Sequence, residues 1–333
     1  MTPSPAHPYA SLTPDHILDA LDSIGLRGDG RLIALNSYEN RVYQVFLEDG
    51  TVVVVKFYRP QRWSDAQILE EHYFAFELQH DEVPVVAPSR VAGVSLHHFG
   101  AFRFAVFPRQ GGRAPELDAA GVLRRIGGFI GRIHRLGATQ SFQHRPSLSI
   151  ERLGDESRAD LLASDFIPSE LRPSWQAAID AALDATRQRF AQAGEIELIR
   201  CHGDCHPGNV LWTDGGAHFV DLDDCMMAPA IQDLWMLVSG DAHSVAQQFD
   251  ELLQGYEPFR RLARNELRLL EPLRTLRLLH YSAWLARRWS DPAFPSAFPW
   301  FNTVRYWQDR ILEMREQIAA LSEPSIEGLL ARV

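Results

Sequence analysis

The sequence has 333 residues, a formal net charge of −10, and 46% hydrophobic and 23% charged residues. A chain of this length is too long for one ordinary core, so we expect two lobes or domains. The acidic balance argues against a nucleic-acid binder that neutralises phosphates, and no apolar run is long enough to span a membrane. The start lacks the basic and apolar regions of a secretory signal, and three cysteines do not make a disulfide framework. We therefore expect a soluble, monomeric, cytoplasmic protein without a nucleic-acid or membrane partner.

The first hundred residues predict an antiparallel sheet with accompanying helices. Thr13-Pro14-Asp15 is typical of a helix start, and this amphipathic helix ends near Gly25. Runs of apolar and alternating residues, separated by turn residues, predict strands. We expect these strands at residues 31–35, 42–47, 51–58, 89–91 and 102–107, with a helix over 65–79.

The pattern changes after a breaker-rich loop at residues 108–112. We expect helices over 119–136 and 174–193, short strands at 197–200 and 217–222, and helical structure on to residue 320. The sequence thus predicts an α+β fold. An N-terminal lobe is expected at 1–108, and a larger, mostly helical lobe at 109–333.

The strongest functional signal is a polar loop between two predicted strands, HGDCHPGN at residues 202–209, followed twelve residues later by Asp221. Phosphoryl transfer needs a carboxylate that orients the attacking hydroxyl and accepts its proton, and metal ligands that hold the triphosphate. The step from Asp204 to Asn209 matches the protein-kinase catalytic loop. Asp204 is therefore the predicted proton acceptor. Asn209 and Asp221 are predicted to bind Mg²⁺, which prefers oxygen ligands, and Asp221 is counted with Asp204 as catalytic.

A zinc cluster is a competing interpretation of the same loop. Its candidate ligands, Cys201, His202, Cys205 and His206, all fall within six residues. Structural zinc sites usually combine two ligand pairs that a longer loop separates, so zinc is disfavoured. His202 is better interpreted as a buried residue that orders the catalytic loop.

Lys56 ends the apolar run 52–55 on the third predicted strand. A buried strand seldom carries a lysine without a partner or ligand. In protein kinases such a lysine holds the α- and β-phosphates and pairs with a Glu on the next helix. Both Glu70 and Glu71 lie on the predicted helix, and we prefer Glu71 because it shares a face with apolar residues. A lysine that reaches solvent is the alternative.

Two further segments are predicted to contact ATP. The loop 36–40 stands where a kinase has its Gly-rich loop; it has no glycine, but the Ser37 hydroxyl and nearby N–H groups can contact phosphates. Phe107 opens the predicted hinge, whose backbone would bind the adenine edge. An ordinary turn and a plain linker are the alternatives.

A buried aspartate and a set of helix arginines in the C-terminal half are interpreted as structural. We expect Asp233 to be buried and to accept backbone hydrogen bonds from the catalytic loop. A long helix carries four arginines that either face a substrate or form salt bridges in solvent, the second being favoured: Arg274, Arg277, Arg287 and Arg288.

The chain resembles the aminoglycoside phosphotransferase/choline kinase superfamily, whose signature is HGDxHxxN followed by a strand that ends in D-x-D. Within it, the chain is similar to bacterial Ser/Thr protein kinases of the stress response. The supporting stretches are LNSYENRVYQV (35–45), VVKFYRPQRW (54–63), QILEEH (67–72), FAVFP (104–108), HGDCHPGNVLW (202–212), FVDLDD (219–224), PAIQDLWML (229–237) and RRWSDPAFP (287–295).

This resemblance implies a bilobal, protein-kinase-like fold, use of ATP and Mg²⁺, and phosphorylation of Ser or Thr on a protein substrate. By residue it implies Asp204 as proton acceptor, Asn209 and Asp221 as magnesium ligands, and Ser37 as an ATP contact. A small-molecule kinase for an alcohol such as an aminoglycoside, choline or homoserine would use the same residues and is the main alternative. A pseudokinase is disfavoured because Lys56 and the three loop residues are all present.

Overall fold

The computed structural model describes residues 7–330, and their backbone contacts divide the chain into two compact units. The first unit contains the chain up to residue 115 together with residues 142–145 and 207–225. The second unit contains residues 116–141, 146–206 and the chain from residue 226 onward. The chain therefore passes between the units several times. The predicted lobe boundary at residue 108 stays a prediction.

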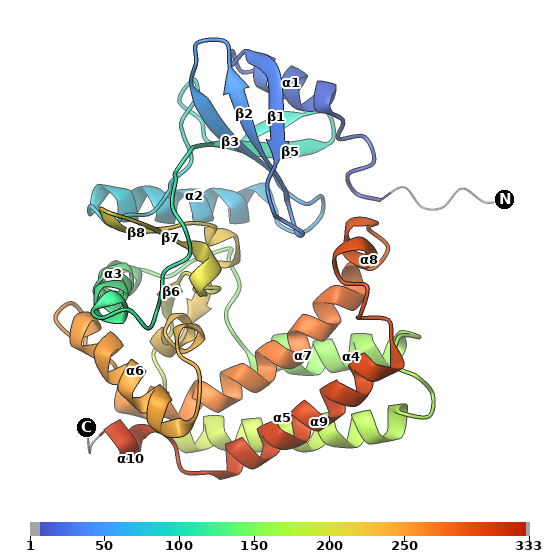
Figure 1. Ribbon diagram of the computed structural model, residues 1–333, viewed down its shortest axis with the longest axis vertical. Coiled ribbons are helices and arrows are strands. Elements are labelled where there is room, and N and C mark those ends of the chain that lie inside the picture. The colour runs from blue at the N-terminus through green and yellow to red at the C-terminus, as the bar shows by residue number, and fades with distance from the viewer. Residues whose placement is uncertain (1–6, 331–333) are drawn as a thin grey trace. The chain divides into compact units, whose positions relative to one another are not determined.

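The first unit is built on a five-stranded antiparallel sheet (Figure 1). Its strand order is β1-β2-β3-β5-β4, with β1 at Gly28–Ala34, β2 at Arg41–Leu47, β3 at Val52–Phe57, β4 at His97–Phe99 and β5 at Phe102–Pro108. Helix α1 (Pro14–Asp22) begins where the Thr13 hydroxyl accepts a hydrogen bond from a backbone N–H of the first turn. Ile17 and Leu21 of α1 pack against one face of the sheet.

Alternation along β3 decides where its lysine points. Val53, Val55 and Phe57 are buried in the cluster that also contains residues of α1. Because successive side chains of a strand point to opposite faces, Lys56 lies on the other face of the sheet. Helix α2 (Asp65–His80), which begins with a capping box between Ser64 and Gln67, supplies the partner of Lys56 described below.

The predicted strand at residues 89–91 is wrong. Val91 instead pairs with Val94 across a tight turn in which Ala92 and Gly93 both have positive φ. This turn ends any extended run, and the strand that follows it is β4 at His97–Phe99.

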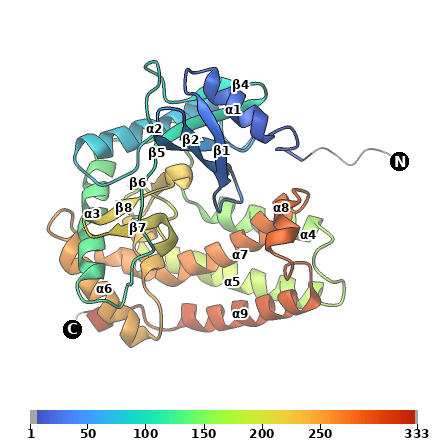
Figure 2. The same ribbon diagram turned by 45° about the horizontal axis from the view of Figure 1, so that its top comes forward.

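A short hairpin of β7 (Val210–Thr213) and β8 (Gly216–Phe219) also belongs to the first unit, and Figure 2 shows it from a second side. Backbone hydrogen bonds attach it there: Phe219 donates to Pro84 O and accepts from Val86 N, while Trp212 exchanges bonds with Arg113. Sequence analysis did not predict β7, and β8 ends earlier than the predicted strand at 217–222.

The second unit is mostly helical. Its long helices are α3 (Val122–Gly137), α5 (Arg172–Ala193), α6 (Ala242–Tyr256), α7 (Leu270–Arg288) and α9 (Val304–Ser322). Its shorter elements are α4 (Glu156–Ala163), α8 (Ala293–Ala297), α10 (Glu327–Leu330) and the antiparallel pair β6 (Ile199–Cys201) and β9 (Met226–Ala228).

Aromatic and aliphatic side chains fill the core of this unit. Helices α5, α7 and α9 run side by side (Figure 1) and bury Trp175, Leu276 and Trp307 between them. Helices α3 and α6 approach more closely, because a Cβ atom on Gly255 would lie 1.8 Å from Arg124 O. The sequence-predicted α+β class, with an antiparallel sheet first and helices after it, is confirmed. Within the described residues, no helix is both long and apolar enough to cross a membrane.

Candidate active site

The loop that follows β6 is held by one buried carboxylate. Asp233 accepts hydrogen bonds from His202 N at 2.7 Å and Gly203 N at 2.8 Å, and from His134 Nε2 at 2.9 Å. Burial would raise the pKa of Asp233, but the bond from His134 and the neighbouring donors hold it below its ordinary value. The predicted role of Asp233 as a support of this loop is therefore confirmed.

Asp204 lies next in the loop and meets cations of its own unit. Its Oδ1 atom lies 2.6 Å from Arg277 Nη1 of α7, and its Oδ2 atom lies 3.6 Å from His206 Nε2. The carboxylate keeps about a quarter of its surface exposed, at 24%. Arg277 was named in the sequence only as one of four helix arginines, and nothing in its spacing indicates that it reaches Asp204.

The β7–β8 hairpin brings the two predicted metal ligands together. Asn209 precedes β7 and Asp221 follows β8, and the hydrogen bond from Val220 N to Asn209 O, 3.0 Å long, joins the two chain ends. Asp221 has a φ of 59°, a conformation that Asp tolerates better than most residues, and its carboxylate is half exposed. The two ends of the hairpin thus carry a half-exposed carboxylate and an amide, which are oxygen ligands of the kind that Mg²⁺ prefers.

Lys56 lies buried among three carboxylates of the same unit. Its Nζ atom lies 3.0 Å from Asp223, 3.1 Å from Asp221 and 3.4 Å from Glu71. Burial alone would lower the pKa of Lys56, but the three carboxylates together raise it well above its ordinary value. Of the 33 lysines and arginines in the sequence, Lys56 is the single lysine.

The two neighbouring glutamates of α2 have different partners. Glu71 is buried and pairs with Lys56, and burial raises its pKa despite that pairing. Glu70 instead accepts the backbone N–H groups of residues 143–145. The structure thus places the preferred Glu71, and not Glu70, beside the lysine.

Asp223 is the residue of this cluster that sequence analysis missed. Besides Lys56 it binds Arg62, and it accepts a hydrogen bond of 3.1 Å from Asn40 Nδ2. Burial would raise its pKa, but Lys56, Arg62 and Arg145 hold it far below the usual range. The available signal was the second Asp of the D-x-D pattern, two residues after Asp221.

Ser37 and Phe107 lie in the first unit, and their contacts are with residues other than Lys56 and its three carboxylates. The Ser37 hydroxyl donates to Asn40 O at 3.2 Å, within its own loop. Phe107, a residue of β5, packs against the cluster of Tyr58 and Ile68. Their predicted contacts with ATP stay predictions.

The structure gives no support to zinc at the catalytic loop. Among the described residues, the one group with ligand atoms close enough for a metal is His134, Cys201 and Asp233, and Asp233 is already engaged by three donors. Burial raises the pKa of the Cys201 and Cys205 thiols well above their ordinary value.

These features define a phosphotransferase of the kinase-like class, and comparison supports this. The pattern of the phosphotransferase enzyme family matches residues 31–293, so the chain belongs to this family and is a kinase. It is 44% identical over 322 residues to "Stress response kinase A" of Escherichia coli strain K12 and 43% identical to "Serine/threonine protein kinase RdoA" of Salmonella typhimurium. Each alignment covers 97% of both chains.

Solved structures share the fold at lower identity. An amicoumacin kinase, in complex with AMP-PNP and Ca²⁺, matches with a TM-score of 0.70 at 20% identity, over 94% of each chain. A microcompartment-associated aminopropanol kinase matches with a TM-score of 0.67 at 20% identity, over 93% of this chain and 96% of the other. The predicted bilobal, kinase-like fold class is thereby confirmed.

Proposed function

We propose that the chain is a cytoplasmic protein kinase of a stress response, which transfers the γ-phosphate of ATP to a Ser or Thr hydroxyl with the help of Mg²⁺. The observation that carries this proposal is the buried Lys56, paired with Glu71 and adjacent to Asp221. A buried ammonium fixed by a helix carboxylate is suited to binding phosphate oxygens. Relatives at 43–45% identity that are named as stress-response and Ser/Thr kinases support the substrate class.

In this proposal each residue has one task. Lys56 binds the α- and β-phosphates, and Glu71 fixes the direction of its side chain. Asn209 and Asp221 hold Mg²⁺, which neutralises charge on the phosphates when bound. The acceptor hydroxyl gives its proton to Asp204 as its oxygen bonds to the γ-phosphorus and the bond from phosphorus to ADP breaks. The rate gain comes from positioning and charge stabilisation.

Because the chain contains one lysine, labelling can test the nucleotide site directly. An acyl-phosphate derivative of ATP transfers its acyl group to a nearby amine, and mass spectrometry of the peptides locates the label. We expect label on Lys56 that excess Mg-ATP prevents, and none at residue 56 in Lys56→Arg. Label confined to the N-terminal amine would contradict the proposed nucleotide site.

Transfer itself is measured with γ-labelled ATP and three acceptors: the protein itself, a basic protein and a panel of small alcohols. Asp204→Ala should abolish transfer to protein. Asp184→Ala is the matched control, because it changes an exposed carboxylate that pairs with Arg187 on the same helix. Label on a small alcohol alone would mean that the substrate is a metabolite or antibiotic and not a protein.

A further inference from the structure

A basic cavity lies in the second unit beside Asp204. Its volume is about 410 Å³, and Arg274 and Arg277 of α7 line it together with His206, Trp235 and Ser239. The two arginines are three positions apart, so they lie on the same face of the helix. Among the described residues that line the cavity there is no carboxylate, although the whole chain has a net charge of −10.

Arg277 joins this cavity to the proposed proton acceptor. Its Nη1 atom is bound to Asp204 Oδ1 at 2.6 Å, while its side chain remains 43% exposed. A guanidinium has five N–H donors, so one arginine can bind Asp204 and an incoming anion at the same time. An anionic group bound here would therefore place its neighbouring atoms next to Asp204.

Contacts with Glu271 and Trp235 fix the position of the Arg274 side chain. Its Nη1 atom lies 2.7 Å from Glu271 Oε1 and 3.0 Å from Glu271 Oε2, and the Gln317 amide donates to the same carboxylate at 2.6 Å. Its guanidinium carbon also lies 5.9 Å from the centre of the Trp235 ring. These contacts orient the arginine at the wall of the cavity, as a built binding site requires.

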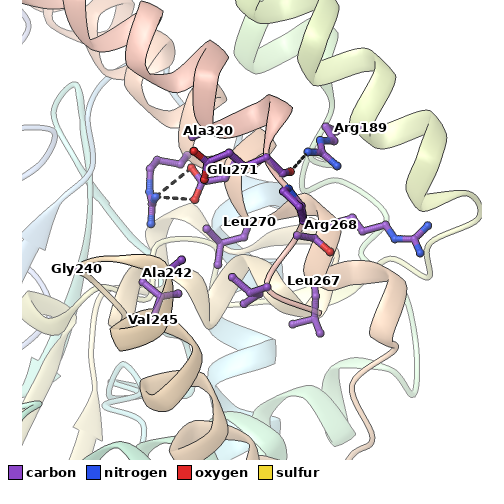
Figure 3. Close-up of a pocket in the computed structure, with 14 residues that line it drawn as sticks. Arg189, Gly240, Ala242, Val245, Leu267, Arg268, Leu270, Glu271 and Ala320 are labelled. Atoms are coloured by element: carbon purple, nitrogen blue, oxygen red, sulfur yellow. Dashed lines mark hydrogen bonds and ion pairs between the residues drawn. The ribbon is translucent and has the colours of Figure 1, made fainter. Parts of the chain in front are cut away.

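A second cavity of the same unit carries no comparable charge pattern. Arg274 lines both cavities, but Glu271 also lines this one, together with Arg189 and Arg268 (Figure 3). Arg189 donates to the carbonyl oxygens of residues 321 and 323, and Arg268 pairs with Glu327 at 3.2 Å. Glu271 and Glu323 line this cavity, whereas no carboxylate lines the cavity beside Asp204, so the second cavity does not offer the same site for an anion.

We infer that the cavity beside Asp204 recognises an anionic group next to the acceptor hydroxyl, so that the enzyme prefers Ser or Thr flanked by acidic or phosphorylated residues. This inference rests on the proposed protein-kinase function. Arg274 and Arg277 bind the anion, and Asp204 takes the proton of the adjacent hydroxyl. The same charges disfavour cationic acceptors.

The test compares four peptides that share one Ser and differ only in its flanking residues: Glu, phosphoserine, Gln or Arg. Wild type should show kcat/KM for the Glu and phosphoserine peptides about tenfold or more above the Gln peptide, and lowest for the Arg peptide, as expected for charge-assisted hydrogen bonds. Arg274→Glu should reverse the order of the Glu and Arg peptides, mainly through KM. Comparing the Glu and phosphoserine peptides identifies which anion fits better.

Arg287→Ala is the matched control, because Arg287 lies on the same helix but pairs with Asp160 at 2.5 Å and does not line the cavity. Its peptide preference should equal that of wild type. Equal rates on all four peptides, or an unchanged order in Arg274→Glu, would overturn the inference and leave the protein-kinase function standing. Phosphorylation of none of the peptides, with label still transferred to small alcohols, would overturn both.

Discussion

The substitution Asp223→Asn removes one negative charge from the carboxylates around Lys56 and keeps the shape of the side chain. Asp223 is 2% exposed and binds two cations, Lys56 and Arg62, as well as the Asn40 amide. Lys56 retains Glu71 and Asp221, but both cations lose a buried partner. Breaking a buried ion pair on one side costs about 3–5 kcal/mol, a large part of the roughly 5–15 kcal/mol that stabilises a protein.

We therefore expect Asp223→Asn to lower Tm by about 10 °C in a thermal melt. Asp224→Asn is the control: Asp224 binds the same Arg62, at 2.5 Å, but its side chain is 39% exposed. An exposed pair contributes only about 0–1 kcal/mol, so this variant should melt within a few degrees of wild type.

The single lysine provides a second measurement. Of the three carboxylates, Asp223 contributes most to the raised pKa of Lys56. Its loss should therefore lower that pKa and speed the reaction of Lys56 with a small amine-reactive reagent. Equal melting of the Asp223 and Asp224 variants, together with unchanged Lys56 reactivity, would refute the assignment of Asp223 as a stabilising buried partner of Lys56.

Three further changes test the second unit. Asp233→Asn leaves the N–H of Gly203 and its neighbours short of an acceptor and should lower kcat about 100-fold with little effect on KM for ATP; an unchanged kcat would count against the loop support. Gly255→Ala forces a Cβ atom onto Arg124 O and should lower the free energy of unfolding, measured in urea, by about 3 kcal/mol. An unchanged free energy would mean that α3 and α6 can move apart at little energetic cost. Burial raises the pKa of Glu266 to about 7, so the unfolded state ionises first and stability is lost as pH rises from about 4.5 to 7. Glu266→Gln should remove that loss and add about 3 kcal/mol at pH 8 but nothing at pH 4; an equal effect at both pH values would refute the assigned ionisation.

Local patterns explain why much of the first unit could be predicted. The alternation that buries Val53 and Val55 also sends Lys56 to the opposite face, and the apolar face of α2 selects Glu71 over Glu70. Both statements need only the periods of a strand and a helix. The contact between Lys56 and Glu71, fifteen residues apart, follows from them.

Long-range contacts could not be predicted in the same way. Arg62 and Asp223 are 161 residues apart, and Arg277 and Asp204 are 73 apart. The periods of a helix or strand do not relate such distant positions. Backbone pairing in other parts of the chain brings them together. For Asp223 that pairing is the attachment of the β7–β8 hairpin through Phe219, and β7 itself was missed since it is only four residues long.

The choice of lysine at position 56 has a physical reason. Arginine supplies every other basic side chain apart from the histidines, so the exception is not explained by composition. Three carboxylates approach one Nζ atom to within 3.4 Å, which suits a compact ammonium better than a planar guanidinium, whose charge is spread over three nitrogens. A point charge held in this way can exchange a carboxylate oxygen for a phosphate oxygen with little movement. The cluster is therefore organised around the lysine, whose neighbours Glu71 and Asp223 are buried while Asp221 alone reaches solvent.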